Sequence, residues 1–285
     1  MKRLFGVFLA IMMMLSCAGC GGNESKSPEE NAQPAKIGAT IPIGMSETDV
    51  KKWTENVAEA EGKPAGYVNP HTIIFFDDLN SMVTALKNKQ IDRFGVCRNV
   101  GKYIVARNDD LTLIDKEHNP ILGYSIAMSE EYASQIEEIN AVIKAMKDDG
   151  TLDKLIKENI TDLGDADPIP VSLPVIEGAP TIKIAVTGDM PPLDCILADG
   201  TPAGFNVAFL GELGKRINKN FELVSIDAKA RGVALSSGQV DALFWVVGTY
   251  DQERKALPYP LDSMKGVAIS FPYMMDSRVA VTLKK

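Results

Sequence analysis

The sequence predicts an α/β protein with two similar lobes, each a mostly parallel sheet flanked by helices. The main observation is an internal repeat, because the pattern Ala-Leu-x-x-x-Gln-Ile/Val-Asp occurs at 85–92 and again at 234–241. An apolar strand comes before each copy, the copy lies in a helical stretch, and a second apolar strand follows. Strand, helix and strand with short connections make a βαβ unit.

The two copies have matching elements in the same order. In the first, strands are predicted at 36–40, 71–77 and 94–97, with a helix at 79–89. In the second, strands are predicted at 182–186, 221–227 and 242–247, with a helix that passes through Leu235. Each first strand is followed by a loop and a helix, and in the first lobe Ser46-x-x-Asp49 has the spacing of a capping box.

Two helices are predicted between the copies. The first runs from about 129 to 146 and places four apolar residues on one face: Ile136, Ile139, Ile143 and Met146. Asp149-Gly150-Thr151 ends it and begins a second helix, which extends to about 159. The proline-rich stretch at 163–180 then predicts a linker.

The composition is that of a soluble protein of about two domains. The chain has 285 residues, of which 45% are hydrophobic and 24% are charged. Its 38 acidic residues outnumber its 30 basic ones, which argues against a nucleic-acid partner. Four scattered cysteines and two histidines give neither a disulfide framework nor a metal-ligand pattern, so no metal and no cofactor are expected.

The N-terminus has the pattern of an export signal. Basic residues precede an apolar run at 4–15, which is too short to span a bilayer and ends in Ala18-Gly19-Cys20. This resembles a bacterial lipoprotein signal peptide at 1–19, with Cys20 as the lipid-modified residue and 20–36 as a flexible tether. Cleavage before Cys17 and a plain secretory leader are the alternatives. Acyl chains on Cys20 would hold the protein on a membrane surface outside the cytoplasm.

Four ordered motifs in the second half resemble the first lobe of the extracellular solute-binding proteins of family 3, the amino-acid transporter type. These are the segment 182–192, Asp199-Gly200-x-x-x-Gly204-Phe205, Leu235-x-x-Gly238-Gln-Val-Asp241, and Phe271-Pro-Tyr273 before 278–283. The first half is similar to the second lobe of that family. The resemblance implies a two-lobed periplasmic-binding-protein-like (type II) fold with a ligand between the lobes.

The order of the lobes differs from that of the family. Here the segment similar to the second lobe (37–119) and the hinge strand and C-terminal helices (120–162) come first. The linker (163–180) and the segment similar to the first lobe (181–285) follow. Circular permutation would produce this order, since each family element occurs once. A fragment of a tandem array is the alternative.

The resemblance implies candidate ligand-binding residues. The nearest equivalent of the family's carboxylate-binding Thr-x-x-Arg pair is Thr249 with Arg254, two residues further apart, and a solvated helix arginine is the alternative for Arg254. The position of the family's ammonium-binding aspartate aligns with Cys97, which carries no charge. The complete set of candidates is Gly44, Met45, Ser46, Cys97, Asp189, Met190, Thr249, Trp245 and Arg254.

The resulting hypothesis is a monomeric, surface-tethered receptor that delivers a small polar, amino-acid-like solute to an ABC permease. A sensory or scaffold lipoprotein with a degenerate cleft is the alternative, which the incomplete set of amino-acid-binding residues favours. An enzyme is not expected, because the sequence has no Gly-x-Ser-x-Gly, no His-Glu-x-x-His and no phosphate loop.

Overall fold

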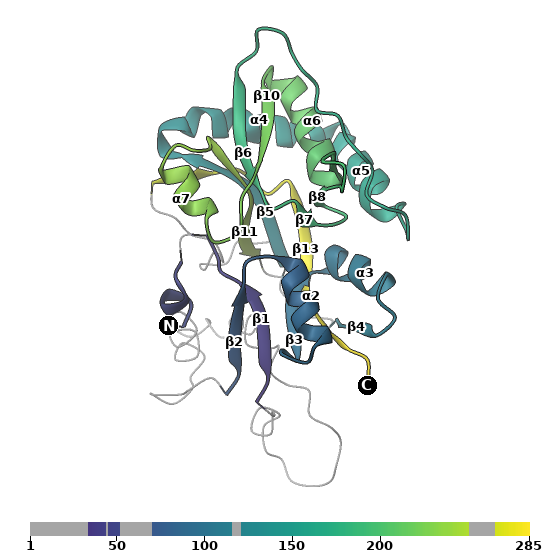
Figure 1. Ribbon diagram of the computed structural model, residues 1–285. Coiled ribbons are helices and arrows are strands. Elements are labelled where there is room, and N and C mark those ends of the chain that lie inside the picture. The colour runs from purple at the N-terminus through teal and green to yellow at the C-terminus, as the bar shows by residue number, and fades with distance from the viewer. Residues whose placement is uncertain (1–33, 44, 52–69, 116–120, 251–265) are drawn as a thin grey trace, which may run out of the picture.

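The computed structural model shows two α/β lobes stacked end to end, with long strands passing between them (Figure 1). It describes residues 34–43, 45–51, 70–115, 121–250 and 266–285. No helix in these ranges is both long enough and apolar enough to cross a membrane.

Lobe one, the lower lobe in Figure 1, is a sheet with helices α2 and α3 packed beside it. Its strands have the order β2-β1-β3-β13-β4, in which β1, β2 and β3 are parallel and β13 is antiparallel to both neighbours. The elements that lobe one contributes are β1 (Lys36–Thr40), β2 (Thr72–Phe76), α2 (Leu79–Lys87), β3 (Arg93–Cys97), α3 (Arg98–Ala106) and β4 (Leu111–Ile114).

Lobe two repeats this arrangement. Its strands have the order β10-β6-β11-β5-β12, with the first three parallel and β5 antiparallel to its neighbours. Its own elements are β6 (Thr181–Val186), α6 (Phe205–Ile217), β10 (Asn220–Ser225), α7 (Arg231–Ser236), β11 (Ala242–Tyr250) and β12 (Val267–Ile269). A small second sheet joins β7 (Asp189–Met190), β8 (Asp194–Ile196) and β9 (Pro202–Ala203). The predicted two-lobed α/β type II fold is therefore confirmed.

Two long strands connect the lobes. β5 (Ile121–Ser129) leaves lobe one and lies in the sheet of lobe two, between β11 and β12. β13 (Met274–Leu283) leaves lobe two, pairs with β5 through its first residues, and then lies between β3 and β4 of lobe one. Each lobe therefore has a central strand that the other lobe supplies.

The helices that follow β5 pack on lobe two. A 3-10 turn, η2 (Glu130–Tyr132), precedes α4 (Ala133–Asp148), so the helix begins later than the predicted residue 129. The four predicted face residues Ile136, Ile139, Ile143 and Met146 are all buried. α5 (Thr151–Ile156) continues into a π turn, η3 (Lys157–Thr161), and both α4 and α5 contact α6.

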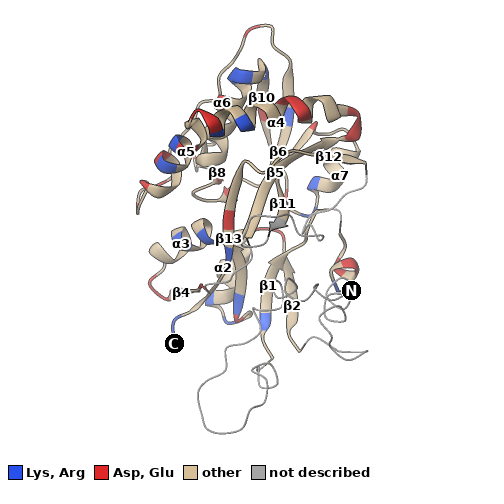
Figure 2. Cartoon of the chain, turned by 180° about the vertical axis from the view of Figure 1, so that it is seen from behind, with Lys and Arg blue, Asp and Glu red and all other residues tan. Residues whose placement is uncertain are grey.

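An ion-pair network fixes these helices to lobe two. Arg216 of α6 donates from Nη1 to Asp149 Oδ2 at 2.7 Å and from Nη2 to Thr151 Oγ1 at 2.8 Å, and its Nε donates to Glu212. Figure 2 shows basic and acidic residues close together on these helices. Half-exposed pairs contribute little each, so the buried face of α4 supplies most of the attachment.

The segment predicted as a linker is docked on lobe two although it forms no helix. Val171 N donates to Pro202 O at 2.9 Å, and Gly204 N donates to Ile169 O at 3.0 Å. The Asn220 side chain bonds the backbone of Ile176 in both directions. Several prolines prevent regular structure here, yet the backbone polar groups find partners on the lobe.

An aromatic cluster forms the centre of lobe two. The Tyr273 ring stacks on Phe209 and on Phe244, with ring centroids 4.7 Å and 4.9 Å apart. This cluster joins α6 and β11 to the residue that directly precedes β13. Gly204, the residue before α6, has φ of +98°, and a Cβ there would lie 2.4 Å from Pro192 O. Only glycine fits this position, which explains the Asp-Gly-x-x-x-Gly spacing.

The end of β13 lies close to the beginning of β1. Thr282 of β13 and Ile37 of β1 both pair with Arg93, from opposite sides of β3. Two inter-strand spacings, about 10 Å, therefore separate them. Three or four residues are enough to bridge this distance.

A reordered chain tests whether the lobe order matters for folding. The reordered chain begins at Leu163, runs to Lys285, continues through a short Gly-Ser linker into Ala35 and ends at Asp162. It keeps every strand pair described above. We expect a single cooperative unfolding transition within about 1 kcal/mol of the original chain. A reordered chain that unfolds in two transitions, or does not fold, would contradict this topology. Urea unfolding followed by circular dichroism makes the measurement.

Candidate functional site

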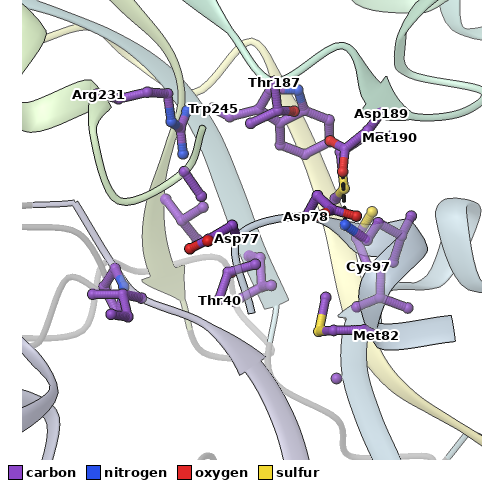
Figure 3. Close-up of a pocket in the computed structure, with 18 of the residues that line it drawn as sticks. Thr40, Asp77, Asp78, Met82, Cys97, Thr187, Asp189, Met190, Arg231 and Trp245 are labelled. Atoms are coloured by element: carbon purple, nitrogen blue, oxygen red, sulfur yellow. Dashed lines mark hydrogen bonds between the residues drawn. The ribbon is translucent and has the colours of Figure 1, made fainter. Parts of the chain in front are cut away.

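A cavity of about 160 Å³ lies between the lobes, at the carboxyl ends of the parallel strands. Figure 3 shows labelled side chains from both lobes facing this space. Lobe one contributes Thr40, Ile41, Pro42, Asp77, Asp78, Leu79, Met82, Gly95, Val96 and Cys97. Lobe two contributes Thr187, Asp189, Met190, Ala228, Arg231, Trp245 and Val247. The crossing strands contribute Leu122, Tyr124 and Arg278.

Two polar contacts join the lobes at the rim of the cavity. Asp189 of β7 accepts a hydrogen bond on Oδ2 from the backbone N–H of Leu79 at 2.7 Å (Figure 3). Leu79 is the first residue of α2, so this carboxylate satisfies a free N–H at a helix N-terminus. Lys229 forms the second contact, an ion pair with Asp77 at 2.5 Å.

A distorted segment of β11 places Trp245 against the cavity. The register of β11 against β5 shifts between Leu243 and Val246, and Trp245 has φ of +62°. A bulky residue in this region of φ is strained, and bulges next to sites commonly redirect a side chain. The Trp245 ring meets Tyr124 edge-on, with centroids 4.4 Å apart, and its indole nitrogen is buried without a partner among the described atoms.

Cys97 forms an uncharged part of the cavity wall. It ends β3, pairs in register with Arg278 of β13, and is 2% exposed. Burial raises the pKa of the Cys97 thiol, and the nearby Asp276 raises it further, so the thiol stays protonated. Cys97 and Cys195 are both free, and Cys195 donates to Ala203 O away from the cavity.

Two buried charged residues of lobe two, Arg231 and Asp194, lie behind this part of the cavity. Arg231 donates from Nη1 to the carbonyl of Phe244, which precedes Trp245. Burial raises the pKa of Asp194 to about 6. Hydrogen bonds that its carboxylate accepts from the N–H groups of Gly188 and Thr187 lower the pKa, but the effect of burial is larger. Asp194 is thus a buried carboxyl whose charge changes near neutral pH.

The structure brings together four of the nine predicted ligand-binding residues. Cys97, Asp189, Met190 and Trp245 line the cavity. Met45 and Ser46 are described but do not line it, and Ser46 forms the predicted capping box with Asp49. Gly44 and Arg254 lie outside the described residues, as does the side chain of Thr249.

Sequence reasoning did not identify Arg278 or Tyr124, which lie on the strands that connect the lobes. Both lie on strands that the sequence predicts only as apolar runs. The one available signal is a single arginine within the apolar run at 274–283. Among the described residues, no group of three or more His, Cys, Asp or Glu side chains is placed to hold a metal ion.

The geometry defines a class of protein, the two-lobed binding proteins whose ligand site lies between lobes joined by crossing strands. Residues 182–284 match the model of the bacterial extracellular solute-binding proteins, family 3. The match covers lobe two and the crossing strand β13, so the similarity to this family is that of the second part of the chain.

The comparison with curated proteins gives one distant relative. The chain is 28% identical over 137 residues to a probable histidine-binding protein of Campylobacter jejuni subsp. jejuni serotype O:2. The match covers 48% of this chain and 47% of the relative, so the chain spans about half the length of the curated relative that it matches.

Similar solved structures are remote in sequence. The GluR0 ligand-binding core in complex with L-glutamate has a TM-score of 0.39 and 9% identity, with 90% of this chain and 86% of that chain covered. The ligand-binding component of an ABC-type import system from Staphylococcus aureus, with zinc bound, has a TM-score of 0.41 and 11% identity, with 88% and 66% covered.

The raised pKa of Asp194 predicts a specific pH dependence of stability. In the folded state the pKa of Asp194 is about 6, whereas the ordinary pKa of an aspartate in an unfolded chain is 3.8. The stabilisation from the proton on Asp194 is complete below pH 3.8 and is lost as the pH rises through about 6. Relative to Asp194→Asn, the free energy of unfolding should fall by about 2 kcal/mol from pH 4 to pH 7. Urea titrations of both proteins at each pH measure it; a difference that does not change with pH would contradict the assignment.

Proposed function

We propose that the protein is a surface-tethered solute-binding receptor that closes its two lobes on a small solute and delivers it to an ABC permease. The observation that carries the proposal is the cavity between two lobes that share crossing strands. The match of residues 182–284 to the model of the bacterial extracellular solute-binding proteins, family 3, supports it. The interlobe contacts of Asp189 and Lys229 at the cavity are polar, so they can break and reform as the lobes move.

The predicted tether is part of the same proposal. Cys20 and the segment 20–36 lie outside the described residues, apart from 34–36. A lipid on Cys20 would keep the binding lobes near a permease in the membrane, which raises their effective concentration there. An extracytoplasmic location follows from this proposal and agrees with the family match.

The chain order is best explained by circular permutation. The family match covers lobe two and the crossing strand β13, which come second in this chain. Each lobe occurs once, and the end of β13 lies about two strands from the beginning of β1. The segments 37–119, 120–162, 163–180 and 181–285 are then the rearranged parts of one binding protein.

A matched pair of variants tests the receptor function. Ala228 lines the cavity and is 5% exposed, whereas Ala230, two residues later, is exposed outside it. Titration calorimetry against the twenty amino acids and a panel of small carboxylates should find at least one ligand. Ala228→Phe should weaken its binding at least tenfold by filling the cavity, and Ala230→Phe should not.

The outcomes separate the two candidate functions. Thermal unfolding of both variants verifies that Ala228→Phe remains folded. Binding that survives Ala228→Phe would place the solute elsewhere and contradict the proposal. An absence of binding across the whole panel would instead favour the sensory or scaffold lipoprotein with a degenerate cleft.

A further inference from the structure

Arg278 is a positive charge in the cavity that has no hydrogen-bond or ion-pair partner among the described residues. It lies on β13, opposite Cys97 of β3, and lines the cavity between the lobes. Its Nε is buried with no hydrogen-bond partner, and in the described part of the chain its guanidinium has no hydrogen bond and no ion pair. Burial lowers the pKa of Arg278, and only the Tyr124 hydroxyl partly offsets this effect.

Such a group is unfavourable in the empty protein. A charged side chain removed from water destabilises the fold unless an opposite charge or several hydrogen bonds replace the water. A partly buried guanidinium without these partners is therefore placed to bind an anion. The position of Arg278 on a crossing strand would place that anion between the lobes.

The carboxylates around the cavity already have partners. Asp78 accepts from Ser81 at the N-terminus of α2, and Asp189 accepts from the N–H of Leu79. Asp77 is paired with Lys229. A ligand ammonium group would have to compete for one of these carboxylates, whereas a ligand carboxylate finds Arg278 available.

The remaining wall fits a small apolar group. Met82, Met190, Val247 and the rings of Trp245 and Tyr124 face the cavity. A volume of about 160 Å³ is close to that of a cavity that holds benzene, about 150 Å³. A branched chain of five or six carbons therefore fills the space beside the charge.

We propose that Arg278 is the anchor for a small monocarboxylate that has a branched or cyclic apolar body and no ammonium group. The guanidinium fork would bind both carboxylate oxygens. This assignment rests on the proposed receptor function and names the class of solute.

Three compounds with one carbon skeleton test the chemistry. These are 4-methylpentanoate, L-leucine, which adds an α-ammonium group, and 4-methylpentanamide, which removes the negative charge. By titration calorimetry, the carboxylate should bind at least tenfold more tightly than either of the others. L-leucine or the amide binding within tenfold of the carboxylate would overturn the assignment, and so would tighter binding of inorganic phosphate.

Variants of Arg278 test its role directly. Arg278→Met should weaken the binding of 4-methylpentanoate at least tenfold and raise the thermal unfolding temperature of the empty protein, because an unpaired charge is removed. The matched control is Arg216→Met, which removes a paired arginine on the far side of lobe two and should leave binding unchanged. Arg278→Met that binds the carboxylate within tenfold of the original protein would overturn the proposal.

Failure of this inference differs from failure of the receptor function. One outcome is an amino acid whose binding is blocked by Ala228→Phe but unchanged in Arg278→Met. In that case the receptor function stands and the monocarboxylate assignment is wrong. If no compound binds, both fail.

Discussion

The exchange of strands between the lobes is the constraint on which the rest of the structure depends. β5 completes the sheet of lobe two and β13 completes the sheet of lobe one, and the two strands pair with each other where they cross. Neither sheet is continuous without a segment from the other half of the chain. Separation of the lobes would therefore break central strand pairs, while rotation about the crossing strands leaves those pairs intact.

This constraint also determines what the cavity contains. Because the crossing strands pass behind the cleft, their side chains Leu122, Tyr124 and Arg278 form its back wall. Residues at the ends of parallel strands form the two sides. A ligand in this position touches both lobes and the strands that connect them, so binding free energy can favour the closed arrangement. In the proposed function, the polar rim contacts of Asp189 and Lys229 would add to closure without fixing it permanently.

Local pattern in the sequence was sufficient for most of the fold and for part of the site. Strand and helix periodicity predicted the βαβ units, and candidates next to strand ends, such as Asp189 and Cys97, do line the cavity. The position of Arg278 in the cavity could not be predicted, because it depends on the register of β13 against β3. This register pairs Arg278 with Cys97, which lies 181 residues earlier in the chain. The docked linker was missed for a related reason, since its prolines exclude helix and strand but do not exclude bonding to a distant lobe.

The distance between the lobes in solution tests the account most directly. Two spin labels report one lobe each: Lys102→Cys labels α3 of lobe one and Val233→Cys labels α7 of lobe two, where Val233 is 69% exposed. Cys17 and Cys20 are replaced by serine so that they take no label. The native Cys97 and Cys195 are buried and can stay. Electron–electron double resonance measures the separation with and without a solute that binds by calorimetry. The account predicts that the saturating solute shifts the distribution to one shorter, narrower distance. A distribution that the bound solute leaves unchanged would contradict closure of two lobes on a shared site.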